Sequence, residues 1–383
     1  MVGRTAEYKQ AAQRTVSGRA GALIALSHDL HAHPETRWQE HRSVQVITSL
    51  LRENSFAVET PVRGLDTAFR ATFGNGAHRI GLVAEYDALE GIGHACGHNI
   101  IAAASVGAAL SLAPLAQELD ATIEVLGTPA EEGGGGKIRL MENGVFDGLD
   151  VAMMVHPGPA DVLWARPLAV SHFDVSYAGK AAHAAAYPHL GVNAADAMTI
   201  AQVSIGLLRQ QLPQSVRVHG ILREAGTAPN AIPERIRGSW YVRAADLDEL
   251  EVIFHKVTRC FEAGALASGC ELSIEETSPR YSQFRNDEQL ADFFQENASS
   301  LGRDMDPEER REGGMNTAST DMGNVSLEIR AIHPYLSINS LPAVNHQKEF
   351  ADTVTTPDAD RAVTDGAYLL AATAVDYLLC GSS

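Results

Sequence analysis

The chain has 383 residues, of which 45% are hydrophobic and 20% charged, enough for one sizeable core and a smaller second one. Its 30 lysines and arginines stand against 48 aspartates and glutamates, which gives a formal net charge of −18. A surface of that sign repels nucleic acid and anionic membranes, and no basic block interrupts it, so neither partner is expected.

The start of the chain, its apolar runs and its cysteines indicate in which cellular compartment the protein is expected. The polar start of the chain lacks the apolar core of a secretory signal. No apolar run is expected to reach the roughly 18 residues of a membrane-spanning helix. The 4 cysteines are too few and too scattered for a disulfide framework in a chain of this length. We therefore expect a cytoplasmic protein with reduced thiols.

Helices alternate with short apolar strands over the first part of the chain. Two helices are expected at about 5–33 and 39–53, and proline at position 34 ends the first of them. Strands are expected at 79–89, in the first half of 121–136 and at 150–158, with helices between them at 100–115 and 137–146. This alternation predicts an α/β fold with a mostly parallel sheet flanked by helices.

The pattern changes after about residue 166. Four segments with alternating polar and apolar residues are expected to be strands, and two longer segments helices, in the order 172–184, 194–212, 215–226, 235–246, 247–269 and 271–278. Strand-helix-strand-strand-helix-strand is typical of a ferredoxin-like α+β domain. We therefore expect an inserted domain at 167–281, between the two parts of a first domain at 1–166 and 282–383.

Side chains of the metal-binding types follow each strand of the first domain. They are Glu85, Asp87, His94, Cys96 and His98 after the first strand, Glu131 and Glu132 after the second, and His156 at the end of the third. The carboxyl ends of parallel strands meet at one edge of a sheet, where α/β proteins bind their ligands. The sequence therefore predicts that these residues converge on one site.

Each group also has a plainer or a different interpretation. Cys96 and His98 fit a metal site, or a catalytic thiol with its base, although residues two apart rarely face each other well enough for the second role. Glu131 and Glu132 fit an acidic loop, or a pair in which one carboxylate binds metal and the other carries a proton. His156 alone fits a core histidine equally well.

Taken together, the motifs resemble a known family. GHACGHN, TPAEEGGGG and VHPG occur in the order and spacing of the dinuclear metal-dependent hydrolases of the aminoacylase and carboxypeptidase type. The resemblance is to the branch with auxin–amino acid conjugate hydrolases, hippurate hydrolase and aminobenzoyl-glutamate hydrolase. HAHPE, GKAAHAA, NAIPE and STDMGNVS extend it over nearly the whole chain.

The details place the chain closer to one part of that branch. AEYDAL, GHACGHN and STDMGN are more similar to aminobenzoyl-glutamate hydrolase subunits and to dipeptidases that cleave β-alanyl or basic dipeptides. Asn99 stands where many members carry aspartate, and Glu90 where proline is usual. The acyl group and the amino acid of the substrate stay open at this point.

The resemblance implies a zinc-exopeptidase-like catalytic domain, with the inserted domain as a lid and dimerisation domain. It implies two divalent metal ions per chain, for which zinc or manganese is the first expectation and cobalt or nickel also fit the ligand types. The implied ligands are Cys96, which bridges the ions, His98 and His156 on one side, and Glu132 and His346 on the other. His333 competes with His346 for the last place.

The resemblance also implies the roles around the metals. Glu131 would be the general base and acid, and Asp87 would orient a metal-bound histidine. His183 would polarise the substrate carbonyl, in its own or the partner subunit's site, while Asn230 and Arg243 hold a substrate carboxylate.

The expected reaction is hydrolysis of the amide bond of a small N-acyl amino acid or dipeptide-like substrate by a homodimer. Two alternatives stay open on the sequence: a metal-free cysteine hydrolase that uses Cys96, and a non-catalytic ligand-binding relative.

Overall fold

The computed structural model describes residues 2–305 and 318–380. The chain forms two compact units: one joins the residues up to Pro167 to those from Phe284 on, and the other is Leu168–Gln283. The boundaries at 167/168 and 283/284 lie one and two residues beyond those expected from the sequence.

The first unit is built around a six-stranded sheet with the order β1-β2-β4-β3-β5-β11. Its strands are β1 (Ala57–Glu59), β2 (Phe69–Phe73), β3 (His78–Glu85), β4 (Ala121–Thr128), β5 (Val151–Met153) and β11 (Arg330–Ile332). The strands from β4 to β11 run parallel, while β2 joins β4 antiparallel and β1 joins β2 antiparallel. The prediction of a mostly parallel α/β sheet is confirmed.

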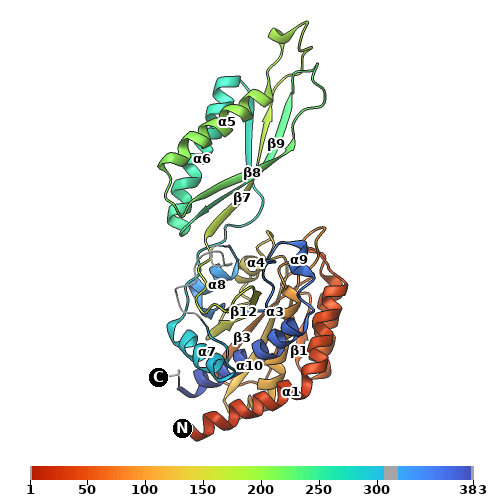
Figure 1. Ribbon diagram of the computed structural model, residues 1–383, viewed down its shortest axis with the longest axis vertical. Coiled ribbons are helices and arrows are strands. Elements are labelled where there is room, and N and C mark those ends of the chain that lie inside the picture. The colour runs from red at the N-terminus through yellow and green to blue at the C-terminus, as the bar shows by residue number, and fades with distance from the viewer. Residues whose placement is uncertain (1, 306–317, 381–383) are drawn as a thin grey trace. The chain divides into compact units, whose positions relative to one another are not determined.

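Helices flank this sheet. They are α1 (Val2–Ala32), α2 (His41–Glu53), α3 (His98–Leu112), α4 (Gly136–Glu142), α7 (Glu288–Ser300), α8 (Met322–Glu328), α9 (Lys348–Ala351) and α10 (Pro357–Cys380). Figure 1 shows this unit with helices such as α1, α7 and α10 around its strands. All residues of α3 are buried, and α3 packs against α1 and α10. A Cβ at Gly107 would lie 2.7 Å from side-chain atoms of both Leu23 and Ala367. Small residues therefore let the three helices approach closely.

Two segments have the length and composition of a membrane span: His98–Leu115 and Pro357–Cys380. The expectation that no apolar run reaches this length is therefore wrong, because many alanines raise the mean hydropathy of both segments. Within the structure, 89% of the first window and 72% of the second are buried. Burial of this kind is what the core helices of a folded unit show.

The third predicted strand is two strands. Residues 150–158 contain β5, which pairs in the main sheet, and β6 (His156–Gly158), which pairs in parallel with β12 (Tyr335–Ser337) in a separate two-stranded ribbon. The backbone leaves the main sheet after Met153, and His156 N then donates to the Pro334 carbonyl. The break places His156 beyond the end of the main sheet rather than within it.

The second unit has one four-stranded antiparallel sheet, ordered β10-β7-β9-β8, and two helices. Its elements are β7 (Ala169–Ala178), α5 (Ala194–Leu208), β8 (Arg217–Glu224), β9 (Arg235–Ala244), α6 (Leu247–Ser268) and β10 (Glu271–Glu276). Phe173, Trp240 and Phe261 belong to the buried core of this unit. The order of elements and strands is that of a ferredoxin-like domain, as predicted.

Candidate metal centre

The loop after β3 carries the first group of metal-type side chains. Gly97 has a φ of +84°, and a Cβ at this position would lie 2.4 Å from the ring of Pro157. Only glycine therefore fits between Cys96 and His98 without strain. The helix α3 begins at His98, so the helix start and the glycine together fix the positions of Cys96 and His98.

The loop after β4 carries Glu131 and Glu132, and buried carboxylates fix its backbone. Ala130, with a φ of +55°, donates its N–H to Glu40 Oε1 at 2.9 Å, and Glu132 N donates to Asp87 Oδ2 at 3.0 Å. A Cβ at Gly136 would lie 1.8 Å from the carbonyl oxygen of Pro129. The glycines thus let this loop fold back on itself, as the Gly-rich sequence indicates.

The five predicted ligand residues lie together. Ligand atoms of Cys96, His98 and His156 lie within 4.8 Å of one another, and so do those of Cys96, Glu132 and His346. Cys96 Sγ is 3.4 Å from His156 Nε2, and His346 Nε2 is 3.3 Å from Glu132 Oε1. The two triads share one sulfur, which is the bridging arrangement that the resemblance implies.

The hydrogen bonds of the histidines leave one ring nitrogen of each for an ion. His98 Nδ1 donates to Asp87 Oδ1 at 3.1 Å, and His156 Nδ1 donates to the Pro157 carbonyl at 2.8 Å. His98 Nε2 is buried and makes no hydrogen bond within the described part of the chain. Bonds of this kind orient metal-binding histidines, and thiolate, imidazole and carboxylate are the donors that zinc takes. The residues present therefore fit divalent metal ions.

The charges of the site favour the ligand form of the cysteine. Burial opposes ionisation of the Cys96 thiol, but the charges of His156 and His98 hold its pKa well below the usual range. Burial likewise opposes a charge on His346, yet its hydrogen bonds to Cys96 and Glu132 raise its pKa to about 11. Since the thiolate is the metal-binding form, Cys96 is prepared for that role.

Glu131 has the opposite environment. Burial first, then the charges of Glu85 and Glu132, raise the pKa of the Glu131 carboxyl well above its ordinary value. A carboxyl group with a raised pKa holds a proton more readily than an ordinary carboxylate, which suits a group that transfers protons in general acid–base catalysis.

The geometry separates the two histidines that competed for the last ligand position. His346 belongs to a triad, and its backbone N–H donates to the Ala95 carbonyl at 2.8 Å. His333 belongs to no triad of the described residues; its ring packs on that of His156, with centroids 5.4 Å apart. Burial, then the charge of His156, lowers the pKa of His333 to about 3. The arrangement favours His346.

The sequence interpretation missed Lys137 and Asp321, two charged residues that are 0% exposed. Lys137 Nζ lies 2.6 Å from Glu85 Oε1 and 2.6 Å from Asp321 Oδ1. The sequence places Lys137 in a predicted helix and Asp321 in the STDMGNVS motif, and neither pattern indicates that the two residues pair. A lysine directly after a Gly-rich loop at the same sheet edge was the one available signal.

The predicted substrate residues all belong to the second unit. His183 is exposed, and its Nδ1 accepts from Ala186 N at 3.1 Å. Ala184 N donates to the Asn230 carbonyl at 2.9 Å, so His183 and Asn230 lie on adjoining segments. Arg243 lies in β9, with Nε 3.5 Å from His219 Nε2.

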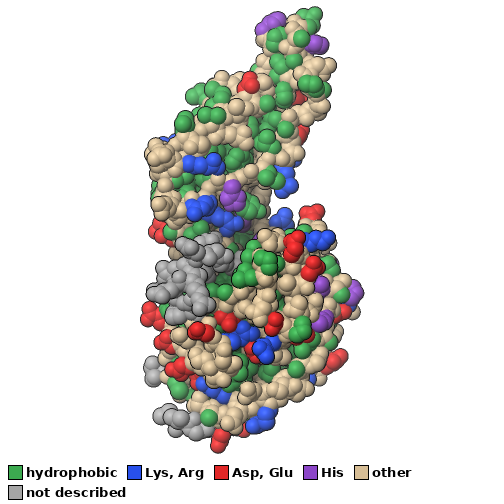
Figure 2. Space-filling model, in the orientation of Figure 1, with side chains coloured by type: hydrophobic (Ala, Val, Ile, Leu, Met, Phe, Trp, Pro, Cys, Tyr) green, Lys and Arg blue, Asp and Glu red, His purple; other side chains and the backbone are tan. Residues whose placement is uncertain are grey.

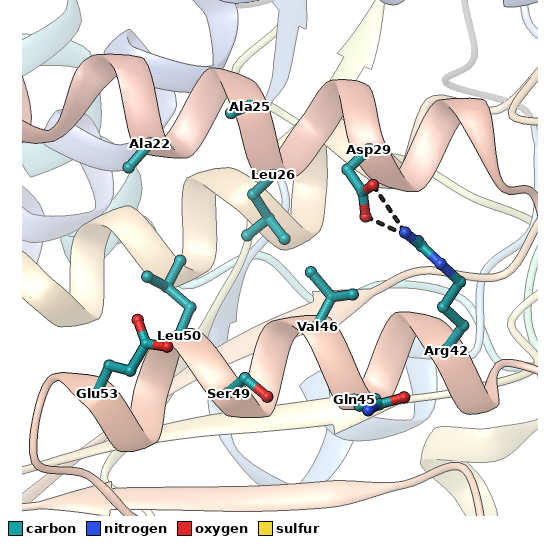
Figure 3. A pocket seen from close by; sticks show the side chains of 10 residues that line it. All are labelled: Ala22, Ala25, Leu26, Asp29, Arg42, Gln45, Val46, Ser49, Leu50 and Glu53. Atoms are coloured by element: carbon teal, nitrogen blue, oxygen red, sulfur yellow. Dashed lines mark hydrogen bonds and ion pairs between the residues drawn. The ribbon is translucent and has the colours of Figure 1, made fainter.

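One surface pocket of the first unit lies outside this centre. It has a volume of about 570 Å³ and lies between α1 and α2 (Figure 3). Leu26, Val46 and Leu50 line it, and a bidentate pair between Asp29 and Arg42 borders it. None of its lining residues belongs to the metal centre, so we do not assign the reaction to it.

An α/β sheet that gathers two ligand triads around one cysteine at its carboxyl edge is typical of metal-dependent hydrolases. Residues 81–379 match the model of peptidase family M20/M25/M40. The chain therefore belongs to this family and is a hydrolase that acts on amide bonds. The resemblance seen in the motifs is confirmed.

Three relatives show the range of the similarity. The chain is 39% identical to mouse Xaa-Arg dipeptidase over 97% of its own length and 89% of the relative's. It is 38% identical to the human Xaa-Arg dipeptidase, over 94% and 86%. Identity to a p-aminobenzoyl-glutamate hydrolase chain of Escherichia coli K12 is 33%, over 63% of this chain and 54% of that one.

Solved structures share the fold. A putative aminohydrolase from methicillin-resistant Staphylococcus aureus matches with a TM-score of 0.77 at 19% identity, over 97% of this chain and 100% of that chain. A dinuclear metal-binding peptidase of this family from Bacillus subtilis matches with a TM-score of 0.71 at 23% identity, over 94% and 99%.

The two histidines can be separated by experiment. His346→Ala should lower the metal content by one ion per chain, because it removes a donor from one triad. His333→Phe, which keeps an aromatic ring against His156, should leave the metal content unchanged. Elemental mass spectrometry after dialysis against metal-free buffer measures both. Loss of metal in His333→Phe with retention in His346→Ala would reverse the assignment.

Proposed function

We propose that the protein is a dinuclear metallohydrolase that cleaves the amide bond of a dipeptide or a small N-acyl amino acid. The observation that carries the proposal is the sharing of Cys96 by two triads, one completed by His98 and His156 and the other by Glu132 and His346. Zinc and manganese are the first choices, because the thiolate and imidazoles suit zinc and the carboxylate also suits manganese; cobalt or nickel fits the set as well. When bound, such ions act as Lewis acids that polarise a carbonyl and lower the pKa of a water.

The proton transfers belong to Glu131. Its carboxylate takes a proton from the attacking water as the bond from the water oxygen to the amide carbon forms. It then gives that proton to the leaving nitrogen as the carbon–nitrogen bond breaks. The raised pKa of the Glu131 carboxyl supports this double role, since the group must hold the proton between the two steps.

Asp87 is a positioning residue in this scheme. One of its oxygens holds the His98 ring, and the other holds the backbone of Glu132. A single carboxylate thus fixes one member of each triad, and orientation of this kind supports metal binding.

The second unit would provide the contacts to the substrate. His183 would donate to the carbonyl oxygen of the scissile amide, and Asn230 and Arg243 would hold a substrate carboxylate. Arg243 is suited to that role because its guanidinium can bind a carboxylate in a bidentate way. Its position beside His219 and over the Tyr241 ring, 5.9 Å from the centroid, steadies the side chain.

The role of Glu131 is open to a direct test. Glu131→Ala should lower kcat by about 10²–10⁴-fold, the usual contribution of a general acid or base, while both ions stay bound. Glu90→Ala, which removes an exposed carboxylate from a neighbouring loop, is the control and should behave as the parent. Steady-state kinetics with elemental analysis of the same samples measures both properties. A fully active Glu131→Ala enzyme would exclude the assignment.

Among the substrate classes, we propose dipeptides with a basic second residue first. The support is the similarity to the two Xaa-Arg dipeptidases, which extends over nearly all of both chains. N-acyl amino acids and aminobenzoyl-glutamate are the second choice, because the similarity to the aminobenzoyl-glutamate hydrolase chain covers 63% of this chain.

A substrate comparison decides between the classes. With manganese or zinc added, kcat/KM for alanyl-arginine should exceed that for N-acetyl-arginine and for p-aminobenzoyl-glutamate by at least tenfold (about 1.4 kcal/mol). Equal or higher values for the acylated compounds would assign the chain to the second class. Binding of all three compounds without turnover would instead support the alternative that the chain is a non-catalytic ligand-binding relative of these enzymes.

We also propose a homodimer through the second unit. β8 is an edge strand, and it exposes Ile221 and Leu222 to solvent. The neighbouring helix α5 exposes Leu207, and its end is tied to β8 by a hydrogen bond from Arg209 to the Val218 carbonyl. Figure 2 shows hydrophobic side chains on the visible surface of this unit. A long exposed edge with apolar residues is a template for pairing with a second chain.

Charge on this surface should break the dimer. Leu207→Glu is expected to yield monomers in light scattering on a sizing column, where the parent elutes as a dimer. Leu266→Glu is the matched control, because Leu266 is 88% exposed on α6, which packs toward the opposite edge strand β10. A monomeric parent, or dissociation only by the control, would contradict this interface.

For the location, we propose the cytoplasm. All four cysteines are free, which suits a reducing compartment. Fractionation of the source cells tests this, and recovery of the protein outside the cytoplasm would contradict it.

The contact of Cys96 with His156 also fits a thiol nucleophile with its base. Membership of a metallopeptidase family favours the metal site instead, and so does the place of Cys96 in both triads.

A further inference from the structure

The metal centre brings six acidic groups close together. Its acidic groups are Cys96, Glu132, Glu131, Asp87, Glu85 and Asp321, all within or directly beside the two triads. Lys137 pairs with two of the six, Glu85 and Asp321, while His98 pairs with Asp87 and His346 pairs with Glu132.

The Lys137 ammonium lies beside a cluster of three buried carboxylates, Glu85, Glu131 and Asp321, which we call the cage. Ligand oxygens of Glu85, Glu131 and Asp321 lie within 4.8 Å of one another, the spacing of groups that can hold one cation. The ammonium nitrogen lies 2.6 Å from Glu85 and 2.6 Å from Asp321. The backbone N–H of Lys137 also donates to Asp321 Oδ2 at 2.9 Å, so both ends of the residue hold the same carboxylate.

A buried charged group such as the Lys137 ammonium is stable only when opposite charges lie close to it. Lys137 and Asp321 are 0% exposed and Glu85 is 1% exposed. Removal of a charge from water is costly, and only close opposite charges offset that cost. Burial opposes the charge on Lys137, but the carboxylates of Asp321 and Glu85 outweigh it and raise the pKa of the ammonium. Lys137 is therefore a permanent cation.

The cage adjoins the reacting groups. Glu131 is a member of the cage and the proposed proton carrier, and Glu85 Oε2 lies 3.5 Å from Nε2 of His98. An ammonium has three donors and a fixed single charge, so it can hold several carboxylates without competing for the cysteine or the histidines.

We propose that Glu85, Glu131 and Asp321 form a third cation site and that the Lys137 ammonium is its built-in occupant. Lys137 is a positioning residue: it fixes the cage of which Glu131 is a part, and it keeps a third metal ion out. The role of Glu131 rests on the proposed function, whereas the cage itself does not.

The test is the number of manganese ions bound at saturation by the parent, Lys137→Ala and the double variant Lys137→Ala/Asp321→Asn. Lys137→Ala vacates the cage and should bind one ion more than the parent. The double variant dismantles the cage and should return to the parent's number. Turnover of Lys137→Ala should fall at least tenfold and recover in part with ethylammonium, but not with tetramethylammonium, which has no N–H to donate to the carboxylates.

Failure of the proposed function would give a different result, namely fewer than two bound ions in the parent protein itself. Equal numbers of ions in all three proteins overturn the third site, and so does a loss of ions in Lys137→Ala. If that variant is folded but too unstable for the ion count, its unfolding temperature is measured with and without ethylammonium. A rise with ethylammonium that tetramethylammonium does not reproduce supports the proposal, and no rise overturns it.

Discussion

One buried sulfur atom links the parts of this site. Cys96 Sγ belongs to both ligand triads, so every other ligand must be placed relative to it. The backbone fixes these positions. Gly97 permits the turn into α3, and the pairing of β6 with β12 places His156 Nε2 3.4 Å from the sulfur. The proposed metal site therefore requires Cys96 to be reduced and unpaired, because the thiolate is the form that binds metal.

A second layer of buried carboxylates holds the triads. Asp87 fixes His98 and the Glu132 backbone, and Glu40 fixes the backbone at Ala130, just before the two glutamates. These bonds keep a loop with an unfavourable backbone angle in a single conformation. The arrangement places four loops that are distant in sequence around one centre, and it explains why the sheet edge is so rich in buried acids.

The sequence predicts the outline of this centre because the chemistry follows strand ends. Glu131, Cys96 and His98 could be placed at one edge from the α/β alternation alone, and the ferredoxin-like order of the second unit follows from its period-two segments. The break between β5 and β6 could not be predicted, since an apolar run has the same appearance in one strand or two. His346 needed the resemblance, because its loop has no periodic pattern.

Lys137 and Asp321 escaped prediction for a physical reason. They are 184 positions apart, and they form an ion pair only in the folded chain, so neither residue alone indicates a role in the site. A lysine in a short helix is usually solvated, and only complete burial reveals the ion pair. The composition of α3 and α10 is misleading in the opposite direction. It matches that of membrane-spanning helices, but the small apolar residues allow close helix packing in the core.

The most direct test of the shared sulfur is anomalous X-ray diffraction from crystals grown with manganese. We expect two anomalous peaks per chain, both within bonding distance of Cys96 Sγ, one beside His98 and His156 and the other beside Glu132 and His346. A single peak, or two peaks of which neither touches the sulfur, would contradict this expectation.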